Sequence, residues 1–390
     1  MKKWPFFACK RRSMAAWRRT RAATFAALCS IVAVTMLAAC SQAQARKVRL
    51  AIVGLNHDHV WGLLNDCARA PQADLVAIAD THTELIAKAR LRVGPRVRFY
   101  SDYIKMLDDV KPDGVIITTE TDHHLAIVRD CAKRGIDVEM EKPMATTGAD
   151  AREMLRLAQA HHIVLMVNYV NNWFPSTQEM YREVKAGKLG PTDKIVVQFG
   201  HQGPREIGIS KEFAEWLYDP VKNGGGALMD FGCYGAALTV WLEGMPQKVY
   251  ARALTLKTSQ HNRVEDDAVL LLEYPRANAI IEPSWDWPYT MERIEVFGLK
   301  GSLLALPQGL LHRAYNEPAS TSNPDGQPVR LNSLPLEESN PIAYYVRHIQ
   351  THAPVRGILS GKLNVEVNEI LDAAKQSIRR GVPVNLDAGD

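Results

Sequence analysis

"VRLAIVGLNHDHVWG", residues 48–62, is the stretch that decides the fold. Its first six residues form a mostly apolar run typical of a buried strand, and the run leads directly into Gly54. A strand that ends at a glycine and is followed by a helix is how a dinucleotide-binding unit begins. The usual fingerprint after such a strand is G-x-G-x-x-G, but only its first glycine is present here. The stretch therefore predicts a dinucleotide-binding unit with a modified loop.

Short apolar runs and helical patterns alternate over the next hundred residues. Runs typical of strands occupy 74–79, 97–100, 113–119, 136–141 and 163–169. Apolar residues spaced three and four apart predict helices over 125–135 and 149–162. Strand–helix alternation of this kind produces a doubly wound parallel sheet. We therefore assign residues 46–168 to an α/β Rossmann domain that binds a dinucleotide.

The apolar runs become longer and richer in β-forming residues after residue 168. They occupy 193–201, 248–258, 266–275, 278–287 and 292–306, and a last helical pattern covers 368–381. Such runs without intervening helices indicate a mostly antiparallel sheet with one open or covered face. We assign residues 169–390 to a second, α+β domain built on this open sheet.

The first forty residues have the composition of a secretory signal. They contain eight Lys and Arg but no Asp or Glu, and an apolar run from Ala22 to Ala39 follows the basic part. This order is typical of signal peptides, although the run is also near the minimum length of a membrane anchor. Its ending, "LAAC" at 37–40, resembles the bacterial lipoprotein cleavage box, whose cysteine is lipidated. We predict a signal peptide over 1–40, lipidation of Cys40, and an exported periplasmic or cell-envelope protein held at the membrane by this lipid.

The rest of the chain is mildly acidic. The full sequence has 47 Lys and Arg against 43 Asp and Glu, and without residues 1–40 the numbers are 39 and 43, a net charge of −4. A protein of this charge has no general electrostatic attraction for the phosphates of nucleic acids. We therefore expect no nucleic-acid partner.

The modified loop keeps some features of a cofactor site. Gly54 supplies the tight turn, and Asn56, at the second glycine position, is among the few residues that tolerate a left-handed backbone. His59 replaces the third glycine, and Asp58 is expected to bring a negative charge near a bound pyrophosphate. Asp80, at the end of the second predicted strand, is placed to accept a ribose hydroxyl and so favours NAD over NADP. Asp80 is equally suited to a turn or to the N-cap of a helix.

A metal site is the alternative interpretation of this loop. His57 and His59 are two residues apart and could share an ion. Further donors, Glu120, His123 and His124, follow another predicted strand at the same edge of the sheet. A single H-x-H without a partner at a known spacing is more typical of loop or pocket polarity. We therefore predict no metal here.

A lysine in "MEKPM", residues 140–144, is a candidate for catalysis. Lys142 follows a predicted strand, at the carboxyl edge where ligands bind in parallel sheets. A partly desolvated lysine at that edge can hold or protonate an oxygen on a reacting carbon. An exposed loop lysine is the alternative interpretation.

The stretch "GGGALMDFGCYGAALTVWL", residues 224–242, predicts a helix that starts after three glycines. Asp230 lies in its first turn and Tyr234 is four residues later, so both are expected on one helical face. A carboxylate that binds a hydroxyl, beside a phenol that transfers a proton, would suit a sugar substrate. A packed core helix with a buried tyrosine fits the same pattern.

Taken in order, these elements resemble the Gfo/Idh/MocA family of oxidoreductases. The resemblance covers roughly residues 47–385 and includes the strand into Gly54, Asp80 after the second strand and Glu141-Lys142-Pro143. It also includes "ITTETDHH" at 117–124 in place of a T-P-N-x-x-H pattern, "GKLGP" at 187–191, "GGGALMDFGCY" at 224–234 and "VFGLKGSL" at 296–303. The family fold is a Rossmann domain followed by an open-sheet domain that binds substrate and often mediates dimers. The resemblance thus implies a homo-oligomer, and a nicotinamide cofactor that oxidises or reduces a secondary alcohol of a sugar, polyol or glycoside.

The resemblance also assigns roles to individual residues. Lys142 corresponds to the catalytic lysine, and Asp230 to the substrate-binding aspartate. Tyr234 replaces the histidine of many members, as in the glucose–fructose oxidoreductase and dihydrodiol dehydrogenase branches, and we assign it the acid/base role, with Lys142 lowering the pKa of its phenol. The expected contacts of the cofactor are Gly54, Asn56, Asp80, Thr119, Thr121, His124 and Glu141, and His57 and His59 are expected to face the substrate.

Two functions follow from these observations. The first is an exported NAD(P)-dependent oxidoreductase whose cofactor is tightly held and regenerated in a redox-neutral cycle, because free nicotinamide cofactor is scarce outside the cytoplasm. The second is a cofactor-free lipoprotein that binds carbohydrate or a partner on the same fold. Lys142 and Tyr234 favour the enzyme, and the altered loop favours the binding protein.

Overall fold

The computed structural model describes residue 1 and residues 46–258, 262–315 and 326–386. The internal contacts divide the chain into two units, Met1–Arg46 and Lys47–Asp390, and the elements below all belong to the second. The predicted signal peptide and Cys40 lie outside the described residues. Within the described part of the chain, no helix combines the length and apolarity that a membrane span requires.

The first sheet has six parallel strands in the order β3-β2-β1-β4-β5-β6. The strands are β1 Val48–Val53, β2 Ala73–Ala79, β3 Arg98–Tyr100, β4 Gly114–Ile117, β5 Asp137–Glu141 and β6 Leu165–Asn168. The helices between them are α2 Val60–Arg69, α3 Thr83–Arg90, α4 Tyr103–Val110, α5 His124–Ala132 and α6 Gly148–His161. Strands β4, β5 and β6 are buried along their whole length, as expected where helices cover both faces of a parallel sheet.

The strand order reverses between β1 and β4, which places a crevice at their carboxyl ends. Ligands of open parallel sheets bind at such a switch point. Gly54 follows β1 with a φ of +90°, and a Cβ there would lie 2.5 Å from Thr119 Cγ2 and 2.6 Å from the Thr118 carbonyl oxygen. Only glycine fits this turn, because it needs both the positive φ and the close approach of the two strands.

The second sheet has nine strands in the order β14-β13-β12-β11-β7-β10-β9-β8-β15. They are β7 Thr192–Gly200, β8 Lys248–Leu254, β9 Asp267–Glu273, β10 Asn278–Ser284, β11 Met291–Gly298, β12 Gly301–Leu306, β13 Gly309–Ala314, β14 Gln327–Pro328 and β15 Val384–Asn385. All neighbours pair antiparallel except β7 and β10. The predicted fold class, a Rossmann sheet followed by a mostly antiparallel open sheet, is therefore confirmed.

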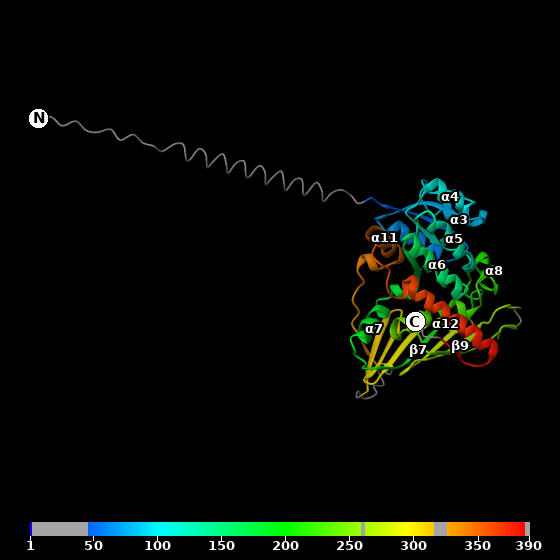
Figure 1. The fold of residues 1–390 in the computed structure, drawn as a ribbon, viewed down its shortest axis with the longest axis vertical. Coiled ribbons are helices and arrows are strands. Elements are labelled where there is room, and N and C mark those ends of the chain that lie inside the picture. Colours follow the sequence, from blue (N-terminus) through cyan, green and yellow to red (C-terminus); the bar gives the residue numbers. More distant parts are fainter. Residues whose placement is uncertain (2–45, 259–261, 316–325, 387–390) are drawn as a thin grey trace. The chain divides into compact units, whose positions relative to one another are not determined.

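Helices connect the two sheets. The remaining helices are α7 Pro175–Lys185, α8 Lys211–Leu217, α9 Ala227–Asp230, α10 Gly232–Glu243, α11 Pro341–Thr351 and α12 Gly361–Arg380, with 3₁₀ turns η1 Thr121–His123, η2 Val170–Trp173, η4 Leu336–Glu338 and η5 Gly357–Leu359. Helix α10 packs on β7 and β10, and α12 packs on β8. Helix α12 also packs on α6 of the first sheet (Figure 1). Helix α11 returns to the first sheet and packs on α2 and β1, although it lies within the range 169–390.

Capping residues fix the ends of α6 and α12. Thr147 Oγ1 accepts the Asp150 amide at the start of α6, and Ser360 Oγ accepts the Leu363 amide at the start of α12. Gly381 ends α12 in a left-handed conformation with a φ of +67°. The helix end predicted at this glycine is confirmed.

The single helix predicted after the three glycines of 224–242 starts where expected, but its continuity is wrong. The structure has two helices, α9 and α10, separated at Phe231. The Phe231 amide still bonds to the Ala227 carbonyl, but the Tyr234 amide bonds to Phe231 itself and begins a new turn. Asp230 thus ends one helix and Tyr234 lies in the first turn of the next, so they do not share the face of one continuous helix.

Candidate functional site

A cavity of about 330 Å³ lies at the switch point of the first sheet. Four of the predicted cofactor residues line it, and these are Gly54, Asn56, Asp80 and Thr119. The side-chain oxygen of Asn56 is buried and has no hydrogen-bond partner among the described residues. An unpaired buried acceptor beside a glycine turn suits a hydroxyl of a dinucleotide, which can donate a hydrogen bond to it. The cavity therefore fits the cofactor that the sequence predicts.

Asp80 holds the loop as well as lining the cavity. Its Oδ2 accepts the amide of Leu55 at 2.5 Å, and its Oδ1 accepts the amide of His82 at 2.6 Å. The His82 ring nitrogen Nδ1 lies 2.8 Å from the same oxygen. The carboxylate therefore acts as a turn residue, and its charge still faces the cavity.

The remainder of the loop is attached to the segment around α8. Trp216 donates its indole N–H to the carbonyl oxygen of Asn56 at 3.0 Å, and the Ser210 amide donates to Asp58 Oδ2 at 2.7 Å. Asp58 also accepts the indole N–H of Trp61 at 3.3 Å. Both Asp58 oxygens are thus used within the protein, and this residue does not line the cavity. The expectation that Asp58 presents its charge to a pyrophosphate is wrong, because these donors hold it elsewhere.

A second attachment involves Glu120 and His123, which line the cavity. Glu120 lies 3.3 Å from the ring of His123 and 3.4 Å from the ammonium of Lys222. Thr121 Oγ1 donates to the side-chain oxygen of Asn223 at 3.3 Å. Although burial opposes ionisation, the hydrogen bond from His123 holds the pKa of Glu120 well below its usual value. The residues after β4 are therefore fixed to the segment that precedes α9.

Lys142 and Asp230 form a buried ion pair at the carboxyl end of β5. The Lys142 ammonium donates to Asp230 Oδ1 and, at 3.3 Å, to the Asp230 carbonyl. Trp285 donates its indole N–H to the other carboxylate oxygen at 2.9 Å. Burial opposes both charges, yet each stabilises the other, so the pKa of Lys142 is raised and that of Asp230 is lowered. Both groups are charged at neutral pH.

Tyr234 lies beside this pair but is not bonded to it. The Lys142 ammonium sits 5.2 Å from the centre of the Tyr234 ring. Tyr169 packs edge-on against that ring at 5.2 Å, and Phe199 stacks on it at the same distance. Burial raises the pKa of the phenol, and the positive charge of Lys142 opposes this only in part. The predicted net lowering of this pKa is wrong, because burial has the larger effect.

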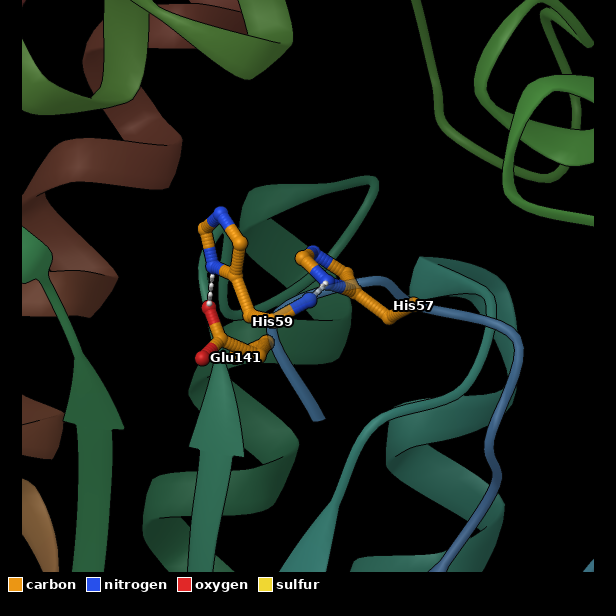
Figure 2. A group of neighbouring side chains, drawn as sticks. All are labelled: His57, His59 and Glu141. Carbon is orange, nitrogen blue, oxygen red and sulfur yellow. Dashed lines mark hydrogen bonds and ion pairs between the residues drawn. The ribbon is translucent and has the colours of Figure 1, made fainter. Parts of the chain in front are cut away.

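Glu141 joins the loop histidines (Figure 2). Its Oε2 lies 2.9 Å from His59 Nδ1, and its Oε1 accepts the side-chain amide of Asn168 at 2.8 Å. Burial opposes its charge, but His59, Asn168 and Lys142 together lower the pKa of Glu141. The ring of His57 lies 4.5 Å from that of His59. The loop and the end of β5 therefore form one polar cluster.

The other residues considered as metal ligands, His123 and His124, form their hydrogen bonds and ion pairs with residues outside this cluster. His123 pairs with Glu120, as described above. His124 Nδ1 lies 3.1 Å from the Met144 carbonyl oxygen, and its Nε2 is buried without a partner among the described residues. Burial lowers the pKa of His124 to about 4, so its ring is neutral.

Comparison with known proteins identifies the family. Residues 48–169 match the family model described as "Oxidoreductase family, NAD-binding Rossmann fold", and residues 177–304 match the Gfo/Idh/MocA C-terminal domain. The chain belongs to the Gfo/Idh/MocA family. It is therefore an NAD(P)-dependent oxidoreductase, and the cofactor-free binding protein is set aside.

Relatives of this family member act on sugars. This chain is 27% identical to D-xylose 1-dehydrogenase (NADP(+)) 2 of Haloferax volcanii over 304 residues. The alignment covers 74% of this chain and 85% of the relative. The structure of aldose-aldose oxidoreductase from Caulobacter crescentus with glycerol has a TM-score of 0.74 and 24% identity, covering 87% and 100% of the two chains. The WlbA dehydrogenase of Bordetella pertussis, in complex with NADH and UDP-GlcNAcA, has a TM-score of 0.73 and 23% identity, covering 88% and 99%. These likenesses in structure confirm the fold.

Three site residues of this Gfo/Idh/MocA protein were not predicted. Asn168 donates a hydrogen bond to Glu141, and Trp285 donates one to Asp230. His201 interacts electrostatically with Asp230. Asn168 ends β6 at the same sheet edge as Glu141, so its position after a predicted strand was an available signal. Trp285 and His201 lie at the ends of β10 and β7, and only the pairing of those strands brings them together.

Proposed function

We propose that this protein oxidises or reduces a secondary hydroxyl of a sugar, polyol or glycoside, using a tightly held nicotinamide cofactor. The observation that carries the proposal is the buried Lys142–Asp230 pair beside Tyr234, at the same sheet edge as the dinucleotide cavity. A buried ion pair with a phenol at such an edge is suited to binding an alcohol or carbonyl oxygen. The sugar-dehydrogenase relative supports the same substrate class.

The bound cofactor supplies or accepts the hydride, and the protein handles the oxygen and its proton. Lys142, which stays protonated, donates a hydrogen bond to the oxygen of the reacting carbon. Asp230 accepts a hydrogen bond from a neighbouring hydroxyl and orients Lys142. Tyr234, whose phenol carries its proton at neutral pH, would donate that proton to the substrate oxygen when a carbonyl is reduced. In the reverse direction, the phenolate left by this donation would take the proton of the alcohol, which restores the phenol.

Tight retention of the cofactor follows from the two attachments around the cavity. Trp216 and Ser210 hold the loop after β1, and Lys222 and Asn223 hold the residues after β4, all from the segment before α9. We expect a dinucleotide to leave more readily when these contacts open. The Asp80 charge at the cavity disfavours a 2′-phosphate, so we propose NAD as the cofactor.

Mass spectrometry of the released nucleotide tests this proposal. The protein is purified without added nucleotide and denatured, and the supernatant is analysed. We expect near-stoichiometric NAD(H). NADP(H) would contradict the choice of cofactor, and an empty protein that takes up no nucleotide on titration would overturn the proposed function.

The substrate class is tested with the resident cofactor as reporter. Sugars, polyols and glycosides are added one at a time, and the fluorescence of bound reduced nicotinamide is followed. We expect a change with at least one sugar-type alcohol or its keto form, and no change in Lys142→Met or Tyr234→Phe. Near-normal turnover in either variant would contradict its catalytic assignment.

We also propose that the protein is exported and attached to the membrane through a lipid on Cys40. The support is the basic, apolar and small-residue order of 1–40 and its "LAAC" ending. Cell fractionation of the full chain and of Cys40→Ala tests this. We expect the first in the membrane fraction and the variant released from it.

A homo-oligomer is the last part of the proposal. The outer face of the second sheet exposes Tyr250, Val269 and Leu271, each 39–42% accessible. Tyr250 and Leu271 are directly opposite each other on β8 and β9, and Ile280 of β10 follows on the same rung. An apolar patch across three strands is suited to a second copy of the chain.

A further inference from the structure

We propose that His57, His59 and Glu141 form a binding site for one divalent transition-metal ion, such as Zn²⁺. The site goes beyond the oxidoreductase function, and its existence is measured without substrate. The proposal departs from the prediction that this loop binds no metal. The change arises from Glu141, which the sequence did not connect with the histidines and which the fold places beside them (Figure 2).

The first support is geometry. One potential ligand atom from each of the three side chains lies within 4.8 Å of the other two. Atoms that bind the same zinc ion are at most about 4 Å apart, so small side-chain rotations close the site. His59 Nδ1 and Glu141 Oε2 are already 2.9 Å apart. The residues come from the loop after β1 and from the end of β5, two elements fixed by the sheet.

The second support is the shell around the ligands. Glu141 uses Oε1 for Asn168, whose own oxygen accepts the indole N–H of Trp173 at 3.0 Å, so Oε2 is held toward His59. The ring of His57 packs 4.4 Å from that of Phe213 and is 2% exposed. Ligating carboxylates and imidazoles in metal sites are oriented by such outer contacts.

The ligand types select the metal. Two imidazoles and one carboxylate suit zinc, iron, cobalt or nickel, whereas magnesium and calcium prefer oxygen ligands throughout. Three protein ligands leave a coordination position open, and the His59 side chain is 35% exposed, so the position is reachable from solvent. The three residues are not among those that line the dinucleotide cavity. The ion would lie at the end of β5, where Lys142 follows Glu141.

Metal titration of the folded protein tests the site. The purified chain, stripped with a chelator, is titrated with Zn²⁺ against a competing indicator and with Co²⁺ by visible absorption. We expect one ion per chain, with the intense absorption of a four- or five-coordinate Co²⁺ site. The variants His59→Ala and Glu141→Gln should each weaken Zn²⁺ binding by at least about a hundredfold.

His82→Ala is the matched control. The pair His82–Asp80 has nearly the same separation, 2.8 Å, and nearly the same exposure as His59–Glu141. Among the described residues, however, this pair belongs to no group of three possible metal ligands. We expect this variant to bind Zn²⁺ like the parent chain. The proposal is overturned if the parent chain binds less than one ion, if His59→Ala binds as tightly as the parent, or if His82→Ala loses binding equally. The Co²⁺ spectrum of the parent chain tests the site without any variant, so the proposal can be overturned even if a variant fails to fold. Nucleotide release is measured in a separate experiment.

Discussion

At the scale of single residues, the Lys142–Asp230 pair contributes both to the free energy of unfolding and to the proposed reaction. Removing one member of a buried ion pair leaves the other charge without compensation. We therefore expect Lys142→Met to lower the free energy of unfolding by about 3 kcal/mol. In the double variant with Asp230→Asn, part of this loss should be recovered, because no uncompensated charge remains. Denaturant unfolding of both variants measures the difference.

The control for this experiment is an exposed pair. Arg156 and Glu153 are 2.7 Å apart on α6, and the Arg156 side chain is 63% exposed. We expect Arg156→Met to change the free energy of unfolding by less than about 1 kcal/mol. Equal losses in Lys142→Met and Arg156→Met would contradict the importance of the buried pair.

His124 gives the protein a pH dependence. Its pKa is about 4 in the folded protein and near 6.5 when unfolded, so the unfolded chain binds more protons between these values. The free energy of unfolding therefore falls as pH is lowered through this window, by about 2 kcal/mol from pH 7 to pH 5 for this residue. We expect His124→Gln to flatten that slope, and His161→Gln, on the exposed end of α6, to leave it unchanged. Urea unfolding at several pH values tests both.

At the scale of elements, the sequence predicted the repeating part of the fold and missed its exceptions. The apolar periods placed β1 through β6 correctly, because burial on both faces leaves a continuous apolar pattern. The break at Phe231 was missed, because a helix of two short pieces has the same composition as one helix. The partners of Asp58 and Glu141 were missed because the contacts span 152 and 27 residues, and no local pattern encodes them.

The attachment of the loop after β1 to α8 leads to a prediction about cofactor exchange. Trp216 is 2% exposed and supplies the hydrogen bond to the Asn56 carbonyl. Trp216→Phe removes that donor and leaves the carbonyl unpaired, so the attachment opens more readily. We expect NADH to dissociate about tenfold faster, measured by stopped-flow displacement.

Trp241→Phe serves as the comparison for this experiment. Trp241 of α10 stacks on Tyr181 of α7 at 3.8 Å and is not among the residues that line the cavity. Its dissociation rate should match that of the parent chain. If both variants released NADH at the parent rate, the attachment would not control retention of the cofactor.

At the scale of the whole molecule, the site exists only because the two sheets meet. Asp230 and Trp285 belong to the second part of the chain, and Lys142 and Glu141 to the first. Helix α12, packed on both α6 and β8, keeps these parts in register. The sequence could assign each residue to an element, but the pairing of residues 88 positions apart follows from the packing.

The last prediction concerns the homo-oligomer and the outer face of the second sheet. Leu271 on β9 is 42% exposed, and it lies between its cross-strand neighbours Tyr250 on β8 and Ile280 on β10. A charge at this position would be buried and unpaired in a face-to-face dimer, so Leu271→Glu should yield a monomer by sedimentation equilibrium. Leu336→Glu, on η4 and away from this sheet face, should keep the assembly of the parent chain. If the parent chain is a monomer, or if Leu271→Glu keeps the oligomer, this face does not join two copies. If the dimer is lost only in Leu271→Glu, the contact lies on β8, β9 and β10, on the side of the sheet opposite α10 and α12.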